Sequence, residues 1–273
     1  MKRRIAIPTL HRKGDQIIPA FKGVADFELF EVPLDTDSFG TFSGEIERTL
    51  SPRDAALAKA RSVLASGNWD GAIASEGSIG PDPYLPFMLS DREILVYLDR
   101  DDLLIEETYR SFEIITARLE FCEGDDLTQF LESADFPRHQ LIVSARIEGQ
   151  LKAIKGIDSH EALHDAIGLM MKESQVLTIE SDLRAHASPS RQQNIAAVAT
   201  RLAKRISQKC PECSCIGWGR VDHLFGVECV ECGHLDQRTA RQVIDGCARC
   251  DHRLAGEVLR EGITAGECEL CNP

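Results

Sequence analysis

Four Cys-x-x-Cys pairs near the C-terminal end of the sequence carry the side chains best suited to hold metal. They are Cys210 and Cys213, Cys229 and Cys232, Cys247 and Cys250, and Cys268 and Cys271. Fifteen residues separate the first two pairs and seventeen separate the last two. This spacing is typical of zinc ribbons, in which two knuckles on a β-hairpin supply four thiolates. The pattern therefore predicts two structural zinc (Zn) sites, because tetrahedral thiolate sites favour that metal.

Two ways of pairing these four motifs are open. Sequential sites would be the simplest, because each would close one hairpin. In a cross-braced arrangement the first motif would join the third and the second would join the fourth. The N-terminus lacks the apolar core of a signal peptide and no stretch approaches a membrane span, so we expect a cytoplasmic protein that does not insert into membranes. In that compartment paired thiols favour metal over disulfides, and an iron–sulfur cluster fits four regular pairs poorly.

The charge of the chain argues against general nucleic-acid binding. The formal net charge is −13, and residues 208–273 carry seven Lys or Arg against eleven Asp or Glu. Binding to a phosphate backbone needs clustered cations, which this region lacks. We therefore expect the ribbons to be structural elements or contacts for a protein partner, and we expect nucleic-acid binding to be unlikely.

Residues 1–207, which precede the cysteine motifs, alternate between strand-like and helix-like patterns. Any site other than the metal sites must be positioned by these strands and helices. The strongest helix start is Ser51-Pro52-Arg53-Asp54, with Ser51 as the N-cap, and the helix should stop near Gly67. Expected strands cover 4–8, 27–34, 69–75, 93–98, 103–107, 112–121, 140–145 and 176–180, and further helices cover 126–133, 159–171 and 189–207.

This alternation predicts an α/β fold with a mainly parallel or mixed sheet. A hairpin at 93–107, midway along the chain, favours two lobes with a cleft between them. We expect one α/β ligand-binding or catalytic domain at 1–207, followed by a tandem zinc-ribbon module at 208–273.

Three polar loops follow expected strands, at 9–15, 35–45 and 75–83. Ligands in such sheets bind at the carboxyl ends of strands. Small residues let backbone N–H groups approach a ligand, and carboxylates hold a divalent metal such as Mg²⁺ or move protons. A single loop of this composition would be read as a turn, but three after consecutive strands favour a site. The candidate catalytic carboxylates are Asp35, Asp37, Glu45 and Glu76, and the candidate ligand-binding residues are Thr9, His11, Lys13, Thr41, Ser43, Ser75 and Ser78.

A locally basic segment adds a fourth part to this candidate site. No acidic residue lies between Asp182 and Glu212. Arg184, His186 and Arg191 flank the start of the helix expected at 189–207, and a helix N-terminus flanked by cations favours an anion. The alternative, a solvated basic face, explains the cations near the helix C-terminus but not these three residues.

The sequence also contains a zinc-protease motif, His160-Glu161-Ala162-Leu163-His164, which we set aside. Its two histidines would lie on one face of a helix. Ile167 and Met170 stand where the extended metalloprotease motif needs Gly and His.

The loop motifs resemble those of a bacterial domain family of unknown function. They are Asp-Thr-Asp-Ser-Phe-Gly-Thr-Phe-Ser-Gly-Glu at 35–45, Ser-Glu-Gly-Ser-Ile-Gly-Pro-Asp-Pro at 75–83 and Arg-Ala-His-Ala-Ser-Pro-Ser-Arg at 184–191, and the final Cys-Asn-Pro also fits. Members usually carry Thr-x-His-x-Lys-Glu near the start, whereas this chain has Gly14 in place of the glutamate. The resemblance supports a site at these loops and names no reaction.

Two classes of function follow from these patterns. The first is an enzyme or binding protein for an anionic small molecule, phosphorylated or carboxylated, with zinc ribbons as a structural module. The second is a non-catalytic protein-interaction module. Nucleic-acid binding through residues 184–209 is a weaker third class.

Overall fold

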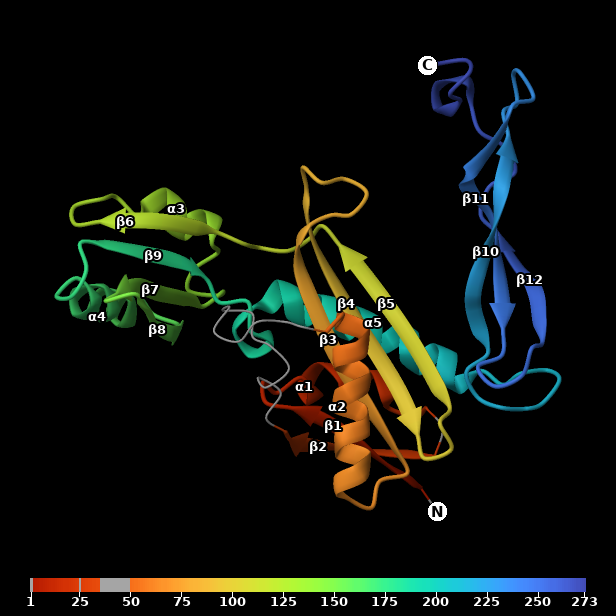
Figure 1. Ribbon diagram of the computed structural model, residues 1–273, viewed down its shortest axis with the longest axis horizontal. Helices are drawn as coiled ribbons and strands as arrows, with labels where there is room; N and C mark the ends of the chain where they lie inside the picture. The colour runs from red at the N-terminus through yellow and green to blue at the C-terminus, as the bar shows by residue number, and fades with distance from the viewer. Residues whose placement is uncertain (1, 25, 35–49) are drawn as a thin grey trace. The chain divides into compact units, whose positions relative to one another are not determined.

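The computed structural model describes residues 2–24, 26–34 and 50–273 and has a mixed α/β architecture (Figure 1). Its strands form a five-stranded, a four-stranded and a three-stranded sheet. In chain order the elements are β1 (Arg3–Thr9), α1 (Gly14–Ile17), the 3-10 helix η1 (Ile18–Phe21), β2 (Phe27–Pro33), α2 (Pro52–Ser66), β3 (Gly71–Pro81), β4 (Leu89–Asp99), β5 (Leu104–Ser111), β6 (Arg118–Cys122), α3 (Thr128–Ser133), β7 (Leu141–Ile147), β8 (Gln150–Ile157), α4 (His160–Met170), β9 (Val176–Ser181), η3 (Ala185–Ala187), α5 (Pro189–Ser207), β10 (Gly219–Glu228), β11 (Leu235–Gly246), β12 (Arg253–Val258) and η4 (Ala265–Glu267).

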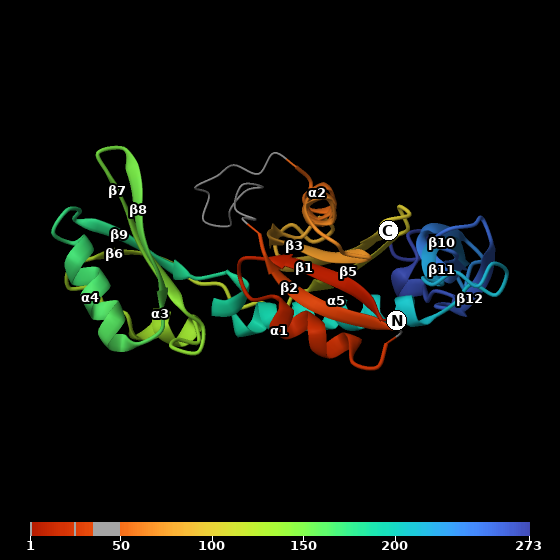
Figure 2. The ribbon, with the colours of Figure 1, turned by 90° about the horizontal axis from the view of Figure 1, so that it is seen from below.

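The five-stranded sheet has the order β2-β1-β3-β4-β5. Strand β1 is parallel to both β2 and β3, whereas β3 and β4 are antiparallel, so the sheet is mixed as predicted. The chain runs from β1 to β2 on one side and then returns to β3 on the other side. Helix α2 covers one face of this sheet, and α1 and α5 cover the opposite face (Figure 2).

Helix α2 forms where its sequence predicts it. The side chain of Ser51 accepts a hydrogen bond from the backbone N–H of Asp54 at 3.1 Å, which satisfies one of the free amides of the first turn. Pro52 occupies the first turn, and the helix ends at Ser66, before Gly67. Its buried face consists mainly of small side chains such as Ala56 and Ala60, which allow close packing on the sheet.

Strand β3 corrects the expectation of a loop at 75–83. Residues 75–81 continue the strand and pair in antiparallel register with β4, from Ser75 opposite Leu95 to Pro81 opposite Leu89. The Gly- and Ser-rich composition predicts a turn locally, but pairing with β4 satisfies the backbone and overrides that preference. Gly77 lies opposite Glu93, where a Cβ atom would approach Arg191 Nη2 and Glu93 Oε1 to 2.4 Å.

The four-stranded sheet is antiparallel and has the order β6-β9-β7-β8. Helices α3 and α4 pack on it through a shared apolar core that includes Phe130, Leu163, Val143 and Ile179. The expected strand at 112–121 is shorter than predicted, since β6 begins at Arg118. Strand β8 was not predicted, because its lysines and glycine interrupt the strand pattern.

The chain divides into two compact units. One comprises residues up to Asp102 together with Glu106–Leu202, and the other comprises Leu103–Ile105 and Ala203–Pro273. The second unit contains the antiparallel sheet β10-β11-β12 and the eight paired cysteines. Within the part of the chain that is described, no helix combines the length and the apolar character needed to cross a membrane.

The close approach at Gly77 predicts a difference between two glycines of β3. A Gly77→Ala variant must displace the buried Arg191–Glu93 ion pair, so we expect it to lose about 1–3 kcal/mol of stability. Gly80→Ala meets no atom within 4 Å and should change stability by less than about 0.5 kcal/mol. Urea unfolding of both variants measures this, and equal stabilities would contradict the packing described.

Candidate functional site

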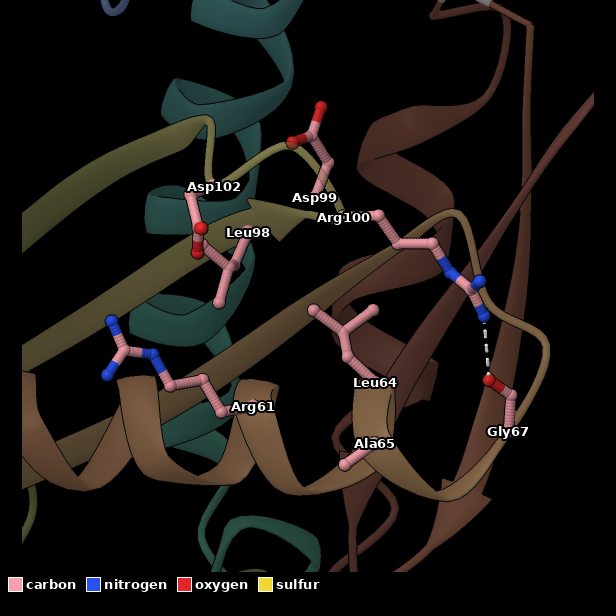
Figure 3. Close-up of a pocket in the computed structure, with 8 residues that line it drawn as sticks. All are labelled: Arg61, Leu64, Ala65, Gly67, Leu98, Asp99, Arg100 and Asp102. Carbon is pink, nitrogen blue, oxygen red and sulfur yellow. Dashed lines mark hydrogen bonds between the residues drawn. The ribbon is translucent and has the colours of Figure 1, made fainter.

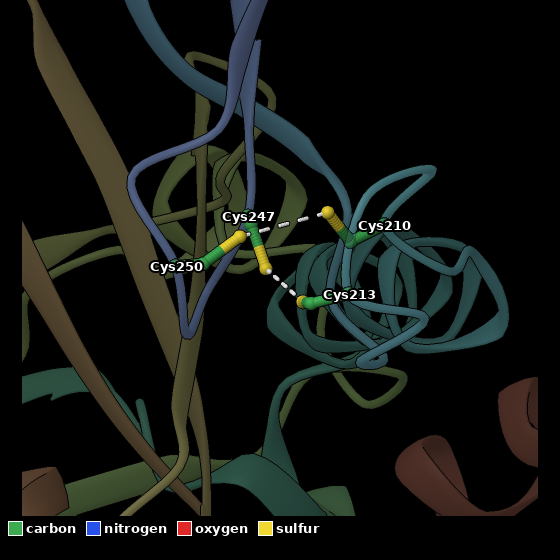
Figure 4. A group of neighbouring side chains, drawn as sticks. All are labelled: Cys210, Cys213, Cys247 and Cys250. Atoms are coloured by element: carbon green, nitrogen blue, oxygen red, sulfur yellow. Dashed lines mark hydrogen bonds between the residues drawn. The ribbon is translucent and has the colours of Figure 1, made fainter.

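The first metal-ligand group consists of Cys210, Cys213, Cys247 and Cys250. Their sulfur atoms all lie within 4.8 Å of one another. Cys210 Sγ lies 3.8 Å from Cys250 Sγ, and Cys213 Sγ lies 3.5 Å from Cys247 Sγ (Figure 4). Four sulfur ligands at one point suit a tetrahedral metal site.

The second group consists of Cys229, Cys232, Cys268 and Cys271, within the same 4.8 Å limit. Cys232 Sγ lies 3.7 Å from Cys268 Sγ, and Cys229 Sγ lies 4.0 Å from Cys271 Sγ. A backbone hydrogen bond from Cys271 lowers the pKa of the Cys268 thiol to about 7, against the opposing effect of burial. A thiolate, which is the form that binds metal, therefore develops there near neutral pH.

The pairing of the motifs is cross-braced, so the simpler sequential arrangement is wrong. The antiparallel order β10-β11-β12 explains this result. The β11–β12 connection carries Cys247 and Cys250, and it turns back at the end of the sheet where β10 begins, after Cys213. The β10–β11 connection, with Cys229 and Cys232, lies at the other end and meets the segment after β12.

A second cluster of functional groups lies at the carboxyl end of β1. Thr9 Oγ1 accepts hydrogen bonds from the backbone N–H groups of His11 at 3.1 Å and Lys13 at 3.4 Å, and thereby fixes the turn. Lys13 is buried. Burial and the charge of Arg191 lower the pKa of Lys13 from 10.5 to about 8, while Glu93 and Glu76 oppose that shift. Among the described residues, no carboxylate forms an ion pair with its ammonium group.

Two buried ion pairs flank Lys13. Lys59 of α2 pairs with Glu76 of β3, and both side chains are less than 10 % exposed. Arg191, in the first turn of α5, donates from Nε to Glu93 of β4 at 2.6 Å and from Nη1 to the carbonyl oxygen of Leu183 at 2.6 Å. A buried charge is costly unless it is paired, and these contacts give each of the four charges a partner of opposite sign.

Asp91 adds a further buried carboxylate to the cluster. It accepts a hydrogen bond from Asn194 Nδ2 at 2.8 Å. Burial, followed by the charge of Glu93, raises the pKa of Asp91 to about 6. The sequence reasoning missed Lys59, Asp91, Glu93 and Asn194, and the one available signal was the polar Asp-Arg-Glu run at 91–93 beside an expected strand.

The basic segment also reaches this cluster. The ring centroids of His11 and His186 lie 5.5 Å apart. Burial is the main cause that lowers the pKa of His186, and the charges of Arg184 and Arg12 lower it further. Arg184 forms an ion pair with Asp182 at 2.5 Å. The structure therefore brings Thr9, His11 and Lys13 together with Glu76, His186 and Arg191.

The remaining candidates lie elsewhere or outside the described residues. Ser75 is buried within β3, and Ser78 accepts a hydrogen bond from Arg92 at 3.4 Å on an exposed part of the same strand. The second predicted loop, with Asp35, Asp37, Thr41, Ser43 and Glu45, lies outside the described residues. His160 and His164 lie on α4, and among described residues the groups of three or more metal-ligand side chains are the two cysteine groups.

A surface pocket lies at the opposite end of the strands and contains none of the candidate residues. It is lined by Arg61, Leu64, Ala65, Gly67, Leu98, Asp99, Arg100 and Asp102 (Figure 3). Arg100 donates to the carbonyl oxygens of Trp69 at 2.5 Å and Gly67 at 2.9 Å, just past the end of α2. These contacts support a structural role for Arg100.

Cross-bracing predicts opposite outcomes for two double variants. A Cys210→Ser/Cys247→Ser variant changes one group and should retain one zinc ion per chain. A Cys210→Ser/Cys229→Ser variant changes both groups and should retain none. Native mass spectrometry after zinc loading measures the count, and sequential sites would give the reverse result.

The depressed pKa of Lys13 predicts a pH-dependent stability difference. The unfolded chain holds the Lys13 proton up to 10.5, whereas the folded chain releases it near 8, so wild-type stability rises with pH between these values. A Lys13→Met variant should be more stable than wild type at pH 7 by up to roughly 3 kcal/mol, and this advantage should shrink across that window. Urea unfolding at several pH values tests this, and a constant difference would contradict it.

Comparisons with known proteins place the chain in a family. No curated protein matches it. The crystal structure of protein VC0702 from Vibrio cholerae aligns with a TM-score of 0.28 and 13% identity, over 41% of this chain and 59% of that chain, so the aligned part spans less than two thirds of that protein. The family model described as "Domain of unknown function (DUF6671)" matches residues 59–273. Since that range covers well over half of the sequence, the chain belongs to the DUF6671 family.

Proposed function

We propose that the protein binds an anionic small molecule, phosphorylated or carboxylated, at the carboxyl end of β1. We also propose that its two cysteine groups hold structural zinc. The single observation that carries the first proposal is Lys13, a buried ammonium group without an ion-pair partner among the described residues. Isolated buried charges are costly, and an anionic ligand would supply the missing partner.

The topology of the five-stranded sheet supports this location. From β1 the chain passes to β2 on one side and later to β3 on the other, with the connecting helices on opposite faces. Ligands of open α/β sheets bind outside the carboxyl ends of strands where the chain connections diverge in this way. Lys13, in the turn that follows β1, lies at that point.

The side chains around Lys13 suit recognition of an anion. His11 and Arg12 belong to the same turn as Lys13, His186 lies against the His11 ring, and these side chains add hydrogen-bond donors near the carboxyl end of β1. Glu76, which remains the candidate for acid–base chemistry, is held by Lys59 next to this neighbourhood. The other candidate carboxylates, Asp35, Asp37 and Glu45, remain sequence-based proposals, as does a magnesium ion bound by them.

A second candidate function is contact with a protein partner through the cysteine-rich unit. Three large apolar side chains of this unit are more than half exposed, namely Phe225 at 53 %, Val230 at 71 % and Leu270 at 66 %. Exposed apolar groups of this kind are common at protein interfaces. The two candidate functions involve different units of the chain and are compatible.

Titration of Lys13 variants with simple anions tests the proposed site. We expect wild-type protein to bind inorganic pyrophosphate or malonate at pH 7, and Lys13→Met to lose at least about tenfold in affinity because the buried ammonium is gone. Wild-type affinity should also fall as the pH rises above about 8, where Lys13 loses its proton. Isothermal titration calorimetry measures these values, and the preferred anion distinguishes phosphoryl from carboxyl ligands.

Lys22→Met is the matched control, because Lys22 is an exposed lysine near the same end of the chain. It should leave the affinity unchanged. Equal affinity in the wild type and Lys13→Met, with both proteins folded by circular dichroism, would refute the site.

A further inference from the structure

Two buried carboxylates of β4 each retain an oxygen atom without a hydrogen-bond partner. These atoms are Asp91 Oδ1 and Glu93 Oε2, and within the described residues neither has a partner. Asp91 is 0 % exposed and Glu93 is 1 % exposed. Buried polar atoms in folded proteins are almost always satisfied, by protein, water or an ion. Each of these two oxygen atoms is therefore expected to contact a water molecule or an ion.

The geometry of the strand places these carboxylates together. Asp91 and Glu93 are two residues apart on β4, so their side chains emerge on the same face of the sheet. Burial raises the pKa of Asp91 most, and the charge of Glu93 raises it further, as expected for a second carboxylate on the same face of the strand. Across the strand pair, Gly77 lies opposite Glu93, and its lack of a side chain lets the Arg191–Glu93 ion pair pack against the strand.

The other oxygen of each carboxylate is already fixed by α5. Asn194 donates to Asp91 Oδ2 at 2.8 Å, and Arg191 donates to Glu93 Oε1 at 2.6 Å. Metal-binding carboxylates are oriented in this way, with one oxygen held by a neighbouring donor and the other directed to the metal. Helix α5 therefore pre-positions two oxygen ligands, which hard cations such as Mg²⁺ prefer.

We propose that Asp91 and Glu93 bind a divalent cation, Mg²⁺ or Mn²⁺, through these two oxygens, with water completing its coordination shell. Magnesium sites commonly use one or two carboxylates and retain several waters. When the proposed anion is also bound, its oxygens can replace some of these waters. Only this replacement rests on the proposed function, because the cation site itself needs no anion. The site differs from the sequence-based magnesium site, which used Asp35, Asp37, Glu45 and Glu76.

The charges of the cluster fit a cation and an anion bound together. Lys13, Lys59 and Arg191 supply three positive charges, and Asp91, Glu93 and Glu76 supply three negative charges when all are ionised. A divalent cation would add two positive charges, which a phosphate group balances. The competing explanation is a proton shared between Asp91 and Glu93, which would satisfy the same oxygens without metal.

Titration of the zinc-loaded protein with Mn²⁺, followed by electron paramagnetic resonance of the free ion, tests the site. We expect one Mn²⁺ per chain in wild type at pH 7.5, and at least about tenfold weaker binding in Asp91→Asn and in Glu93→Gln. Asp101→Asn, which changes an exposed carboxylate in the turn after β4, is the control and should bind like wild type. Binding should weaken below pH of about 6, where Asp91 takes up its proton.

The pH series on wild-type protein keeps the test decisive if either variant fails to fold. Absence of Mn²⁺ binding to wild type, unweakened binding below pH 6, or equal binding in folded variants would each overturn the proposal. Lys13→Met separates the two proposals, because it should lose anion binding and retain Mn²⁺. A protein that binds Mn²⁺ at Asp91 and Glu93 but binds no anion would refute the proposed function alone.

Discussion

The cost of burying charge determines how the five-stranded sheet and α5 fit together. Arg191 and Glu93 are each about 1 % exposed, and removing either would leave an uncompensated charge inside the protein. Their ion pair fixes the first turn of α5 on β4 and requires a glycine at position 77, since a side chain there would occupy the same space. Lys13 then lies beside charges whose positions are already fixed.

Local signals in the sequence predict the longer helices and the first strands well, whereas the short helices α1 and η1 were missed. The N-cap at Ser51 and the Ser-Pro start of α5 mark helix boundaries directly, and β1 and β2 are recognisable from their apolar pattern. The residues of β3 from 75 to 81 mislead, because their composition is that of a turn and only a distant partner strand makes them extended. Pairing between strands far apart in sequence cannot be read from local propensity.

The candidate site could be predicted only where local sequence signals mark the element that carries its residues. Thr9, His11 and Lys13 follow a clear strand, so their place at its carboxyl end follows from the α/β pattern. Asp91 and Glu93 lie on a strand whose direction and neighbours the sequence does not reveal, and acidic residues there indicate exposure rather than a buried pair. The residue type of Lys59 likewise predicts a surface position, and only its contact with Glu76 shows that it is buried.

Cross-bracing of the cysteine groups has a consequence for how the second unit matures in the cell. Sequential sites would close loops of fifteen or seventeen residues, whereas the observed groups join knuckles separated by 33 residues, from Cys213 to Cys247, and 35 residues, from Cys232 to Cys268. Neither group can be completed before β11 has left the ribosome, and the second also needs Cys268 and Cys271, which follow β12. Each metal site therefore forms only after the partner knuckle has been synthesised, and a chain that stops between Cys250 and Cys268 would complete its first group but have only two of the four thiols of its second.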